Sequence, residues 1–118
     1  MVAMTDWTIY HDPRSPQSRE ALRLLRDNGV EPKVVEYLKT APTERELEML
    51  LMKLGMKAED LLRRKEPGFK RKYGAFKFNE HEWVRLMHEQ PTLIDRPIVV
   101  KGHKAVLCRP LDKIEELL

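Results

Sequence analysis

The chain of 118 residues has a single cysteine, Cys108. One cysteine excludes an internal disulfide and a metal site built from cysteines alone, and it is typical of a protein kept in a reducing compartment. No apolar run approaches the ~20 residues of a membrane-spanning helix. Residues 1–6 lack the basic segment and apolar core of a signal peptide. We therefore expect a cytoplasmic protein that has no membrane partner.

Motifs for common cofactors are also missing. The chain has no Gly-rich phosphate-binding loop, and its His, Asp and Glu residues show no spacing typical of a metal site, so we expect neither a bound cofactor nor a metal. The net charge of +3, from 22 Lys+Arg against 19 Asp+Glu, is too mild to indicate a nucleic-acid partner. The basic run Arg63–Lys72 is interpreted as a solvated face.

What the chain does have is the composition of a soluble globular protein, with 42% hydrophobic and 35% charged residues. Its length is close to the modal size of a domain and is sufficient for a core without disulfides or metals. We expect one domain over residues 7–118, a flexible lead at 1–6, and a monomer.

The N-terminal third predicts a βαβ unit. Residues 7–10 and 33–37 are rich in β-branched and aromatic side chains, which is typical of strands. The helical pattern between them ends at Asn28-Gly29, a common helix stop. Because strand, helix and strand follow one another, the two strands are expected to be parallel with a right-handed crossover.

The middle of the chain is predicted to be helical. Thr43 with Glu46, and Asn79 with Glu82, each have the spacing of a capping box at a helix start. Apolar residues follow the first of these boxes at the spacing of one helix face. The predicted elements are helices at 43–54, at 58–64 and from 79 to the residue before Pro91, with a loop or broken helix at 65–77.

The C-terminal segment predicts a β-hairpin and a helix. Strand-like runs at 96–100 and 105–108 are joined by a short turn, which favours an antiparallel pair, and Arg109-Pro110 opens a last helix. The order β-α-β, helices, β-β-α is that of an α/β thioredoxin-like fold. We expect a mixed four-stranded sheet with helices on both faces and a helical insertion between strands 2 and 3.

The stretch 11–19 joins the first strand to the first helix, where open α/β sheets bind ligands. Ser15 precedes Pro16, which favours the first helical position and pushes the residue before it toward the extended conformation of a helix cap. Serine is a good cap, and the free N–H groups at a helix start attract anions. Ser15 either only caps the helix or occupies the position of a nucleophile.

Other polar residues also have two interpretations. His11 either tunes a nucleophile or an anion site, or it is a loop histidine with a local hydrogen bond. Ser18 is interpreted as a first-turn residue that bonds local backbone. Three arginines have the side chain that binds oxyanions through two parallel hydrogen bonds, although their spacing alone indicates only surface charges; they are Arg63, Arg96 and Arg109.

The stretch 9–19 resembles the active-site loop of the glutaredoxin-coupled arsenate reductase family. That loop reads tyrosine, histidine, asparagine, proline, any residue, cysteine, two more residues, serine, arginine. The resemblance covers residues 7–118. No single motif is specific to the family, but the ordered set of motifs is. The further matching segments are Asn28-Gly29-Val30-Glu31-Pro32, Tyr37-Leu38 with Pro42, Leu61-Leu62-Arg63, Lys65-Glu66, Arg96-Pro97-Ile98-Val99-Val100 and Leu107-Cys108-Arg109-Pro110.

This resemblance implies a fold, an activity and a set of site residues. It implies a thioredoxin-like fold in which a small oxyanion binds at the 11–19 loop and is reduced with glutathione and glutaredoxin. Pro97 would be a cis proline beside the site, and His11 would favour the ionised form of a nucleophile at position 15. The arginines implied to converge on the oxyanion are Arg63, Arg96 and Arg109.

Two residues depart from the family loop. Asp12 stands where the family has asparagine, which puts an acid beside an anion site. Ser15 stands where the family has its nucleophilic cysteine. A helix start can lower the pKa of a thiol from about 8.5 into the physiological range, whereas a serine hydroxyl titrates several units higher. The sequence therefore predicts a chain that does not carry out thiol-dependent reduction.

Three interpretations of Ser15 stay open. It is an engineered replacement that silences the cysteine, a natural serine in a binding-only relative, or a sign that Cys108 supplies the thiol. Pro16 and Gln17 also differ from the small or basic residues usual in the family, which favours natural drift. Cys108 is expected to be a small buried hydrophobe.

A regulator without catalytic activity is the second function class that the resemblance implies, besides an enzyme scaffold. The same resemblance includes regulators, similar to the Spx group, that bind RNA polymerase. Those regulators usually keep a pair of cysteines in the first loop, and this chain has none there. The alternative is thus a non-catalytic interaction module.

Overall fold

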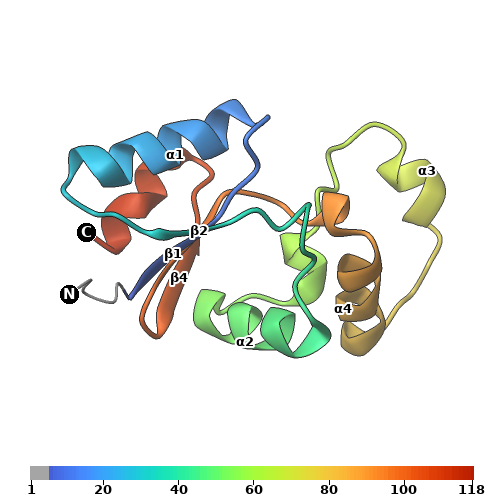
Figure 1. Ribbon diagram of the computed structural model, residues 1–118. Coiled ribbons are helices and arrows are strands. Elements are labelled where there is room, and N and C mark those ends of the chain that lie inside the picture. Colours follow the sequence, from blue (N-terminus) through green and yellow to red (C-terminus); the bar gives the residue numbers. More distant parts are fainter. Residues whose placement is uncertain (1–5) are drawn as a thin grey trace. The chain divides into compact units, whose positions relative to one another are not determined.

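The computed structural model describes residues 6–118 (Figure 1). Of the lead predicted at 1–6, residues 1–5 lie outside the described part. The chain forms two compact units, one made of Met1–Thr40 with Arg96–Leu118 and the other of Ala41–Asp95. The second unit is thus the segment predicted as a helical insertion.

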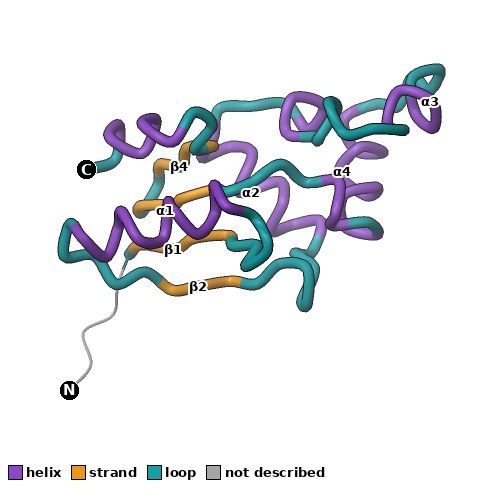
Figure 2. The backbone as a smooth tube through the Cα atoms, turned by 90° about the horizontal axis from the view of Figure 1, so that it is seen from above, coloured by secondary structure: helices purple, strands orange, loops and turns teal. Residues whose placement is uncertain are grey.

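The first unit contains a four-stranded sheet in the order β2-β1-β3-β4 (Figure 2). β1 pairs with β2 in parallel and with β3 in antiparallel, and β3 pairs with β4 in antiparallel. This is the predicted mixed sheet. The strands are β1 (Trp7–Tyr10), β2 (Lys33–Val35), β3 (Ile98–Lys101) and β4 (Lys104–Leu107).

The strand ends differ slightly from the predicted ones. β3 begins at Ile98 rather than at Arg96, because Pro97 has no backbone N–H to donate to a ladder. β4 ends at Leu107, and the N–H of Cys108 instead donates to the Pro97 carbonyl at 2.9 Å. The two residues before β3 and the two after β4 are therefore loop residues at the same end of the hairpin.

Two helical elements cover one face of this sheet: α1 (Pro16–Asp27) and the C-terminal η3 (Leu111–Glu116) (Figures 1 and 2). The last element is a 3-10 helix, whereas the sequence predicts an ordinary helix there. Fully and nearly fully buried side chains from β1, α1, β3, β4 and η3, and from the residues directly after β4 and η3, form one hydrophobic core: Ile9, Ala21, Leu25, Val99, Val106, Cys108, Ile114 and Leu117.

The second unit is helical, as predicted. Both predicted capping boxes are present, at Thr43 with Glu46 and at Asn79 with Glu82. The region 65–77 holds one short helix, so it is a broken helix rather than a loop alone. The elements are α2 (Glu44–Leu54), η1 (Ala58–Leu61), α3 (Phe69–Tyr73), α4 (Glu80–Glu89) and η2 (Pro91–Leu93).

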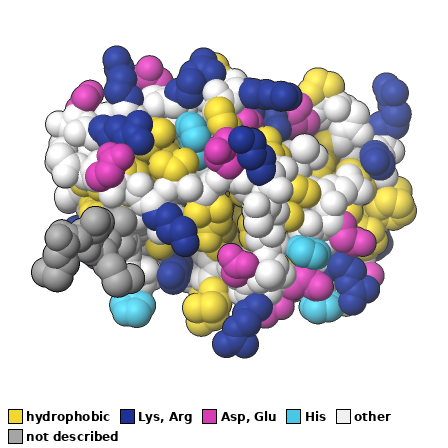
Figure 3. All heavy atoms as spheres, in the orientation of Figure 1, with side chains coloured by type: hydrophobic (Ala, Val, Ile, Leu, Met, Phe, Trp, Pro, Cys, Tyr) yellow, Lys and Arg dark blue, Asp and Glu magenta, His cyan; other side chains and the backbone are white. Residues whose placement is uncertain are grey.

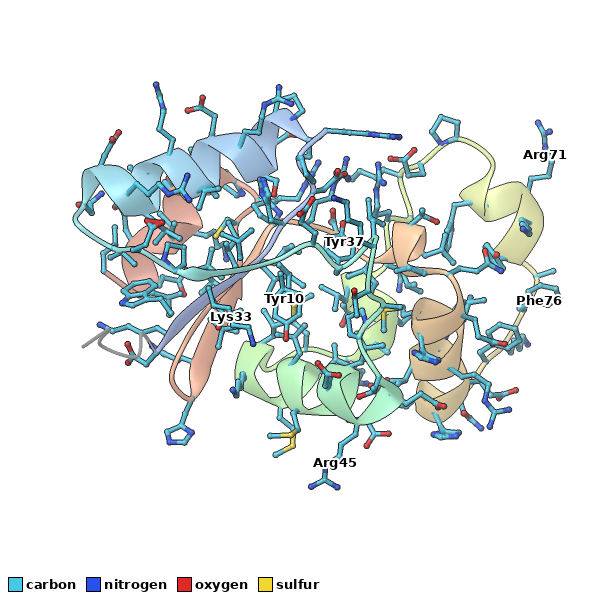
Figure 4. All side chains as sticks on the ribbon, in the orientation of Figure 1. Tyr10, Lys33, Tyr37, Arg45, Arg71 and Phe76 are labelled. Atoms are coloured by element: carbon cyan, nitrogen blue, oxygen red, sulfur yellow. The ribbon has the colours of Figure 1, made fainter. Side chains whose placement is uncertain are left out.

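A row of aromatic rings connects α3 to α4 within the second unit. Phe69, Tyr73, Phe76, Phe78 and Trp83 contact one another in sequence order, with ring centroids 4.8–6.1 Å apart. Figure 4 shows Phe76 at the outer side of this unit, where its side chain is half exposed. Aromatic stacking therefore holds a segment that has few helical hydrogen bonds of its own.

Charged side chains of both signs are interspersed on the face of the molecule shown in Figure 3. Across residues 6–118, no helix combines the length and the apolar character that a membrane span requires.

Candidate functional site

Ser15 is the N-cap of α1. Its backbone is extended, with φ −85° and ψ 121°, and its Oγ accepts a hydrogen bond from the Ser18 N–H at 3.3 Å. The hydroxyl donates to Gln17 Oε1 at 3.2 Å, and only 1% of the residue is exposed. Pro16 occupies the first helical position. The cap predicted from Ser15-Pro16 is present, and it places the residue 15 side chain among the first N–H groups of the helix.

Ser18 is the residue that holds the loop together. Its Oγ lies 2.6 Å from His11 Nδ1 and accepts the Asp12 N–H at 3.0 Å, and the residue is fully buried. The sequence predicts only a local backbone bond for Ser18, and its bond to His11 was missed. A histidine seven residues before a serine gives no signal until the loop is known to turn back on the helix start.

His11 is buried and is held by its backbone as well as its ring. Its N–H donates to the Val35 carbonyl at 2.8 Å. Burial lowers the pKa of His11 from its ordinary 6.5, while the nearby carboxylates of Glu36 and Asp12 act in the opposite direction. The ring is therefore neutral at neutral pH. A neutral ring protonated at Nε2 accepts the Ser18 hydroxyl proton at Nδ1, which leaves the Ser18 oxygen to accept from Asp12.

The lowered pKa of His11 predicts a pH dependence of stability. Below pH 6.5 the unfolded chain binds a proton at this ring more readily than the folded chain does, so the free energy of unfolding falls as the pH drops through that value. The fall levels off below the pKa of the folded state. We expect His11→Gln to remove this component. The free energy of unfolding in urea is measured for both chains at pH 7.5 and at pH 5.5, and the loss between the two pH values should be smaller in the variant. An unchanged pH dependence in the variant would contradict it.

Asp12 and Arg96 form an ion pair beside the cap. Arg96 Nε lies 3.7 Å from Asp12 Oδ2, and the two side chains are 14% and 9% exposed. Asp12 Oδ1 accepts the Arg14 N–H at 3.0 Å, and the Asp12 carbonyl accepts the Ser15 N–H at 3.0 Å. The cap, the acid and one predicted arginine therefore lie together.

A second predicted arginine, Arg109, is hydrogen-bonded to the backbone of the first, Arg96. Arg109 Nη1 donates to the Arg96 carbonyl at 3.2 Å. The peptide bonds Arg96–Pro97 and Arg109–Pro110 are both cis, and the second of these was not predicted. Arg96 and Arg109 therefore leave the two ends of the β3–β4 hairpin side by side, within the same unit as Ser15.

Arg63 belongs to the second unit. It pairs with Glu66, and its Nη1 donates to the Thr92 carbonyl at 3.4 Å. The structure thus gives Arg63 its own partners among residues 41–95, and its convergence with the other two arginines stays a prediction.

Cys108 is fully buried in the core of the first unit. Burial raises the pKa of its thiol to about 12, and the Glu116 carboxylate acts in the same direction. A thiol in this state is neutral and inaccessible at physiological pH, so Cys108 is a core residue. This weighs against the interpretation in which Cys108 replaces a cysteine at position 15.

A metal site has no support in the described residues. Between residues 6 and 118, no three His, Cys, Asp or Glu side chains are gathered so that they hold a metal ion. The start of α1 and the nearby arginines supply backbone N–H and guanidinium donors, which suit an anion, although the Asp12 carboxylate lies beside them.

The family model described as "ArsC family" matches residues 10–117 of this chain. The chain belongs to the ArsC family. Its match includes the whole 11–19 loop, the hairpin with Arg96 and Arg109, and the helical second unit.

Curated and solved ArsC-family relatives resemble nearly the whole chain. The arsenate reductase of Escherichia coli is 38% identical over 98% of this chain and 82% of its own length. The YfgD protein of Escherichia coli, an uncharacterized protein, is 42% identical over 93% of this chain and 94% of its own. The solved arsenate reductase from Vibrio cholerae superposes with a TM-score of 0.90 at 37% identity, covering 99% of this chain and 100% of that structure. The thioredoxin-like α/β fold of the chain is that of the family.

Proposed function

We propose that this chain is an arsenate-reductase-family scaffold that binds a small oxyanion, such as arsenate, at the 11–19 loop without reducing it. Residues 7–118 would form the single family domain. The observation that carries the proposal is that Ser15 caps α1 within one unit that also holds Arg96 and Arg109. Relatives named arsenate reductase match over almost the full chain, which supports the ligand class.

Electrostatics supports an anion at this place. The first N–H groups of a helix favour negative charge by about 0.3–1 kcal/mol at an exposed site and more in a partly buried one. Two guanidinium groups add donors whose planar geometry matches an oxyanion. Asp12 partly offsets this charge, and His11 adds none because its ring is neutral at neutral pH.

Redox chemistry needs a group that residue 15 no longer provides. In a relative with cysteine at this position, the thiolate would bond to arsenic, and glutathione with glutaredoxin would supply the electrons for reduction to arsenite. A serine oxygen bonded to arsenic has no thiol electrons to deliver, and it is un-ionised where a thiol would be a thiolate. Cys108 is buried and its pKa is raised to about 12, so it does not act as the nucleophilic thiol instead.

Titration calorimetry with arsenate tests the oxyanion proposal. We expect saturable binding of arsenate to the parent chain, and Arg109→Gln should weaken it by about tenfold or more, the loss expected for one charge-assisted hydrogen bond. Arg109 suits this test because its side chain is exposed and its Nη1 donates to a backbone carbonyl, that of Arg96. Arg23→Gln, an equal charge change on the exposed face of α1, is the control and should bind as the parent does. Absence of arsenate binding, or equal weakening in both variants, would refute the proposal.

A further inference from the structure

We propose that Asp12 makes this site selective for oxyanions that carry a proton, such as hydrogen arsenate and hydrogen phosphate, over sulfate, which carries none. The inference rests on the proposed oxyanion site and specifies its ligand class. It comes from a residue that departs from the family loop, where asparagine is usual. Asparagine presents an amide donor and acceptor, whereas an ionised carboxylate only accepts.

Asp12 is placed to contact a ligand at the cap. The residue is 6% exposed, and its carbonyl accepts the Ser15 N–H, so it lies one turn from the capping hydroxyl. Its Oδ2 faces Arg96, the first of the two arginines of the unit that are proposed to hold the oxyanion. An oxyanion held by Arg96 and the start of α1 would therefore meet the Asp12 carboxylate.

The carboxylate keeps acceptor capacity for such a ligand. Oδ1 accepts one hydrogen bond, from the Arg14 N–H. Oδ2 lies 3.7 Å from Arg96 Nε, which is an ion-pair distance but too long for a hydrogen bond. A carboxylate offers about four lone-pair positions, so Oδ2 can accept an O–H from a bound ligand while the ion pair with Arg96 persists.

The protonation state of the ligand then decides whether its contact with the Asp12 carboxylate is attractive or repulsive. Arsenate and phosphate each keep a proton on at least one oxygen at neutral pH, and that O–H donates to the carboxylate in a charge-assisted hydrogen bond worth about 1.5–3 kcal/mol. Sulfate has no proton to donate, so each of its oxygens meets the Asp12 oxygens as one negative charge meets another. A site that leaves a buried polar group unpaired, or opposed, rejects such a ligand strongly.

A structural role for Asp12 predicts something different. If the carboxylate only held Arg96 and the loop in place, its removal would change the affinity for all oxyanions by a similar factor. A specificity role changes the ratio of affinities instead. The ratio of sulfate to phosphate dissociation constants is therefore the readout that separates the two roles.

The test is calorimetric titration of the full chain and of Asp12→Asn with inorganic phosphate, arsenate and sulfate, at neutral pH and constant ionic strength. Asparagine keeps an acceptor for the Arg14 N–H and is the residue usual in the family loop, so the variant should fold; its thermal midpoint checks this. Asp27→Asn, the same change at the other end of α1, is the matched control.

For the parent and for Asp27→Asn we expect phosphate and arsenate to bind about tenfold or more tightly than sulfate. In Asp12→Asn the preference should shrink toward unity, chiefly because sulfate binds more tightly. The inference is overturned if the parent binds sulfate as tightly as phosphate, or if the ratio of the two dissociation constants is unchanged in Asp12→Asn. Either result is still compatible with the proposed oxyanion site. Binding of none of the three anions overturns both.

Discussion

Ser15→Cys is expected to give the chain a measurable thiol-dependent arsenate reductase activity, which we propose that the parent lacks. The new thiol would lie at the cap of α1, where 1% of the present serine is exposed and its oxygen meets the Ser18 N–H. A helix start lowers a thiol pKa from about 8.5 toward the physiological range. Removal of a nucleophile typically costs about 10⁴- to 10⁶-fold in rate, so we expect a gain of at least about a thousandfold, measured as arsenite formed with glutathione and glutaredoxin present.

Two further variants assign the activity to residue 15. Ser15→Ala should stay inactive, because it removes the hydroxyl without supplying a thiol. Adding Cys108→Ala to Ser15→Cys should leave the gained activity in place, since Cys108 is a core side chain with a pKa of about 12. Loss of the gained activity with Cys108→Ala, in a variant that still folds, would show that Cys108 takes part after all. Activity in the parent chain would contradict the silent role given to Ser15.

Ser18→Ala is expected to destabilise the chain by about 2–4 kcal/mol. The change removes one oxygen that serves two buried groups, His11 Nδ1 at 2.6 Å and the Asp12 N–H at 3.0 Å. Leaving a buried donor or acceptor unsatisfied costs about 1–3 kcal/mol for each group. Chemical denaturation of the parent and the variant at pH 7.5 measures the difference in unfolding free energy.

Ser15→Ala is the comparison for this loss of stability. Ser15 has one capping bond, and substitution of a cap costs about 0.5–2 kcal/mol. We therefore expect Ser18→Ala to be the more destabilising of two chemically identical changes three residues apart. The reverse order would mean that the bonds from His11 and Asp12 to Ser18 do not hold the loop.

The local elements were readable from the sequence because their signals are local. Ser15-Pro16 predicts a capped helix start, and the capping boxes at Thr43 and Asn79 are both formed. The parallel pairing of β1 with β2 followed from the succession of strand, helix and strand, and the antiparallel hairpin followed from its short turn; both are present. The final segment was predicted as an ordinary helix and is a 3-10 helix, because apolar spacing over few residues does not distinguish the two.

The site was less predictable, because its contacts join residues that are distant in sequence. The pairing of Asp12 with Arg96 spans 84 positions, and only the meeting of β1 with β3 brings them together. Resemblance to a family named both arginines of the first unit, yet it could not reveal that Asp12 faces one of them. Ser18 was visible as a serine in a first turn, while its bond to His11 depends on the path of the loop.

Amide NMR of the isotope-labelled chain during a titration with arsenate measures most directly where an oxyanion binds. An oxyanion at the start of α1 predicts saturable shifts of the Gln17, Ser18 and Arg19 amides, with smaller shifts at Arg96 and Arg109. The same titration of Arg109→Gln should require about tenfold or more arsenate for the same shifts. Shifts confined to the basic run Arg63–Lys72, or no saturable shifts at all, would contradict an oxyanion site in the 11–19 loop.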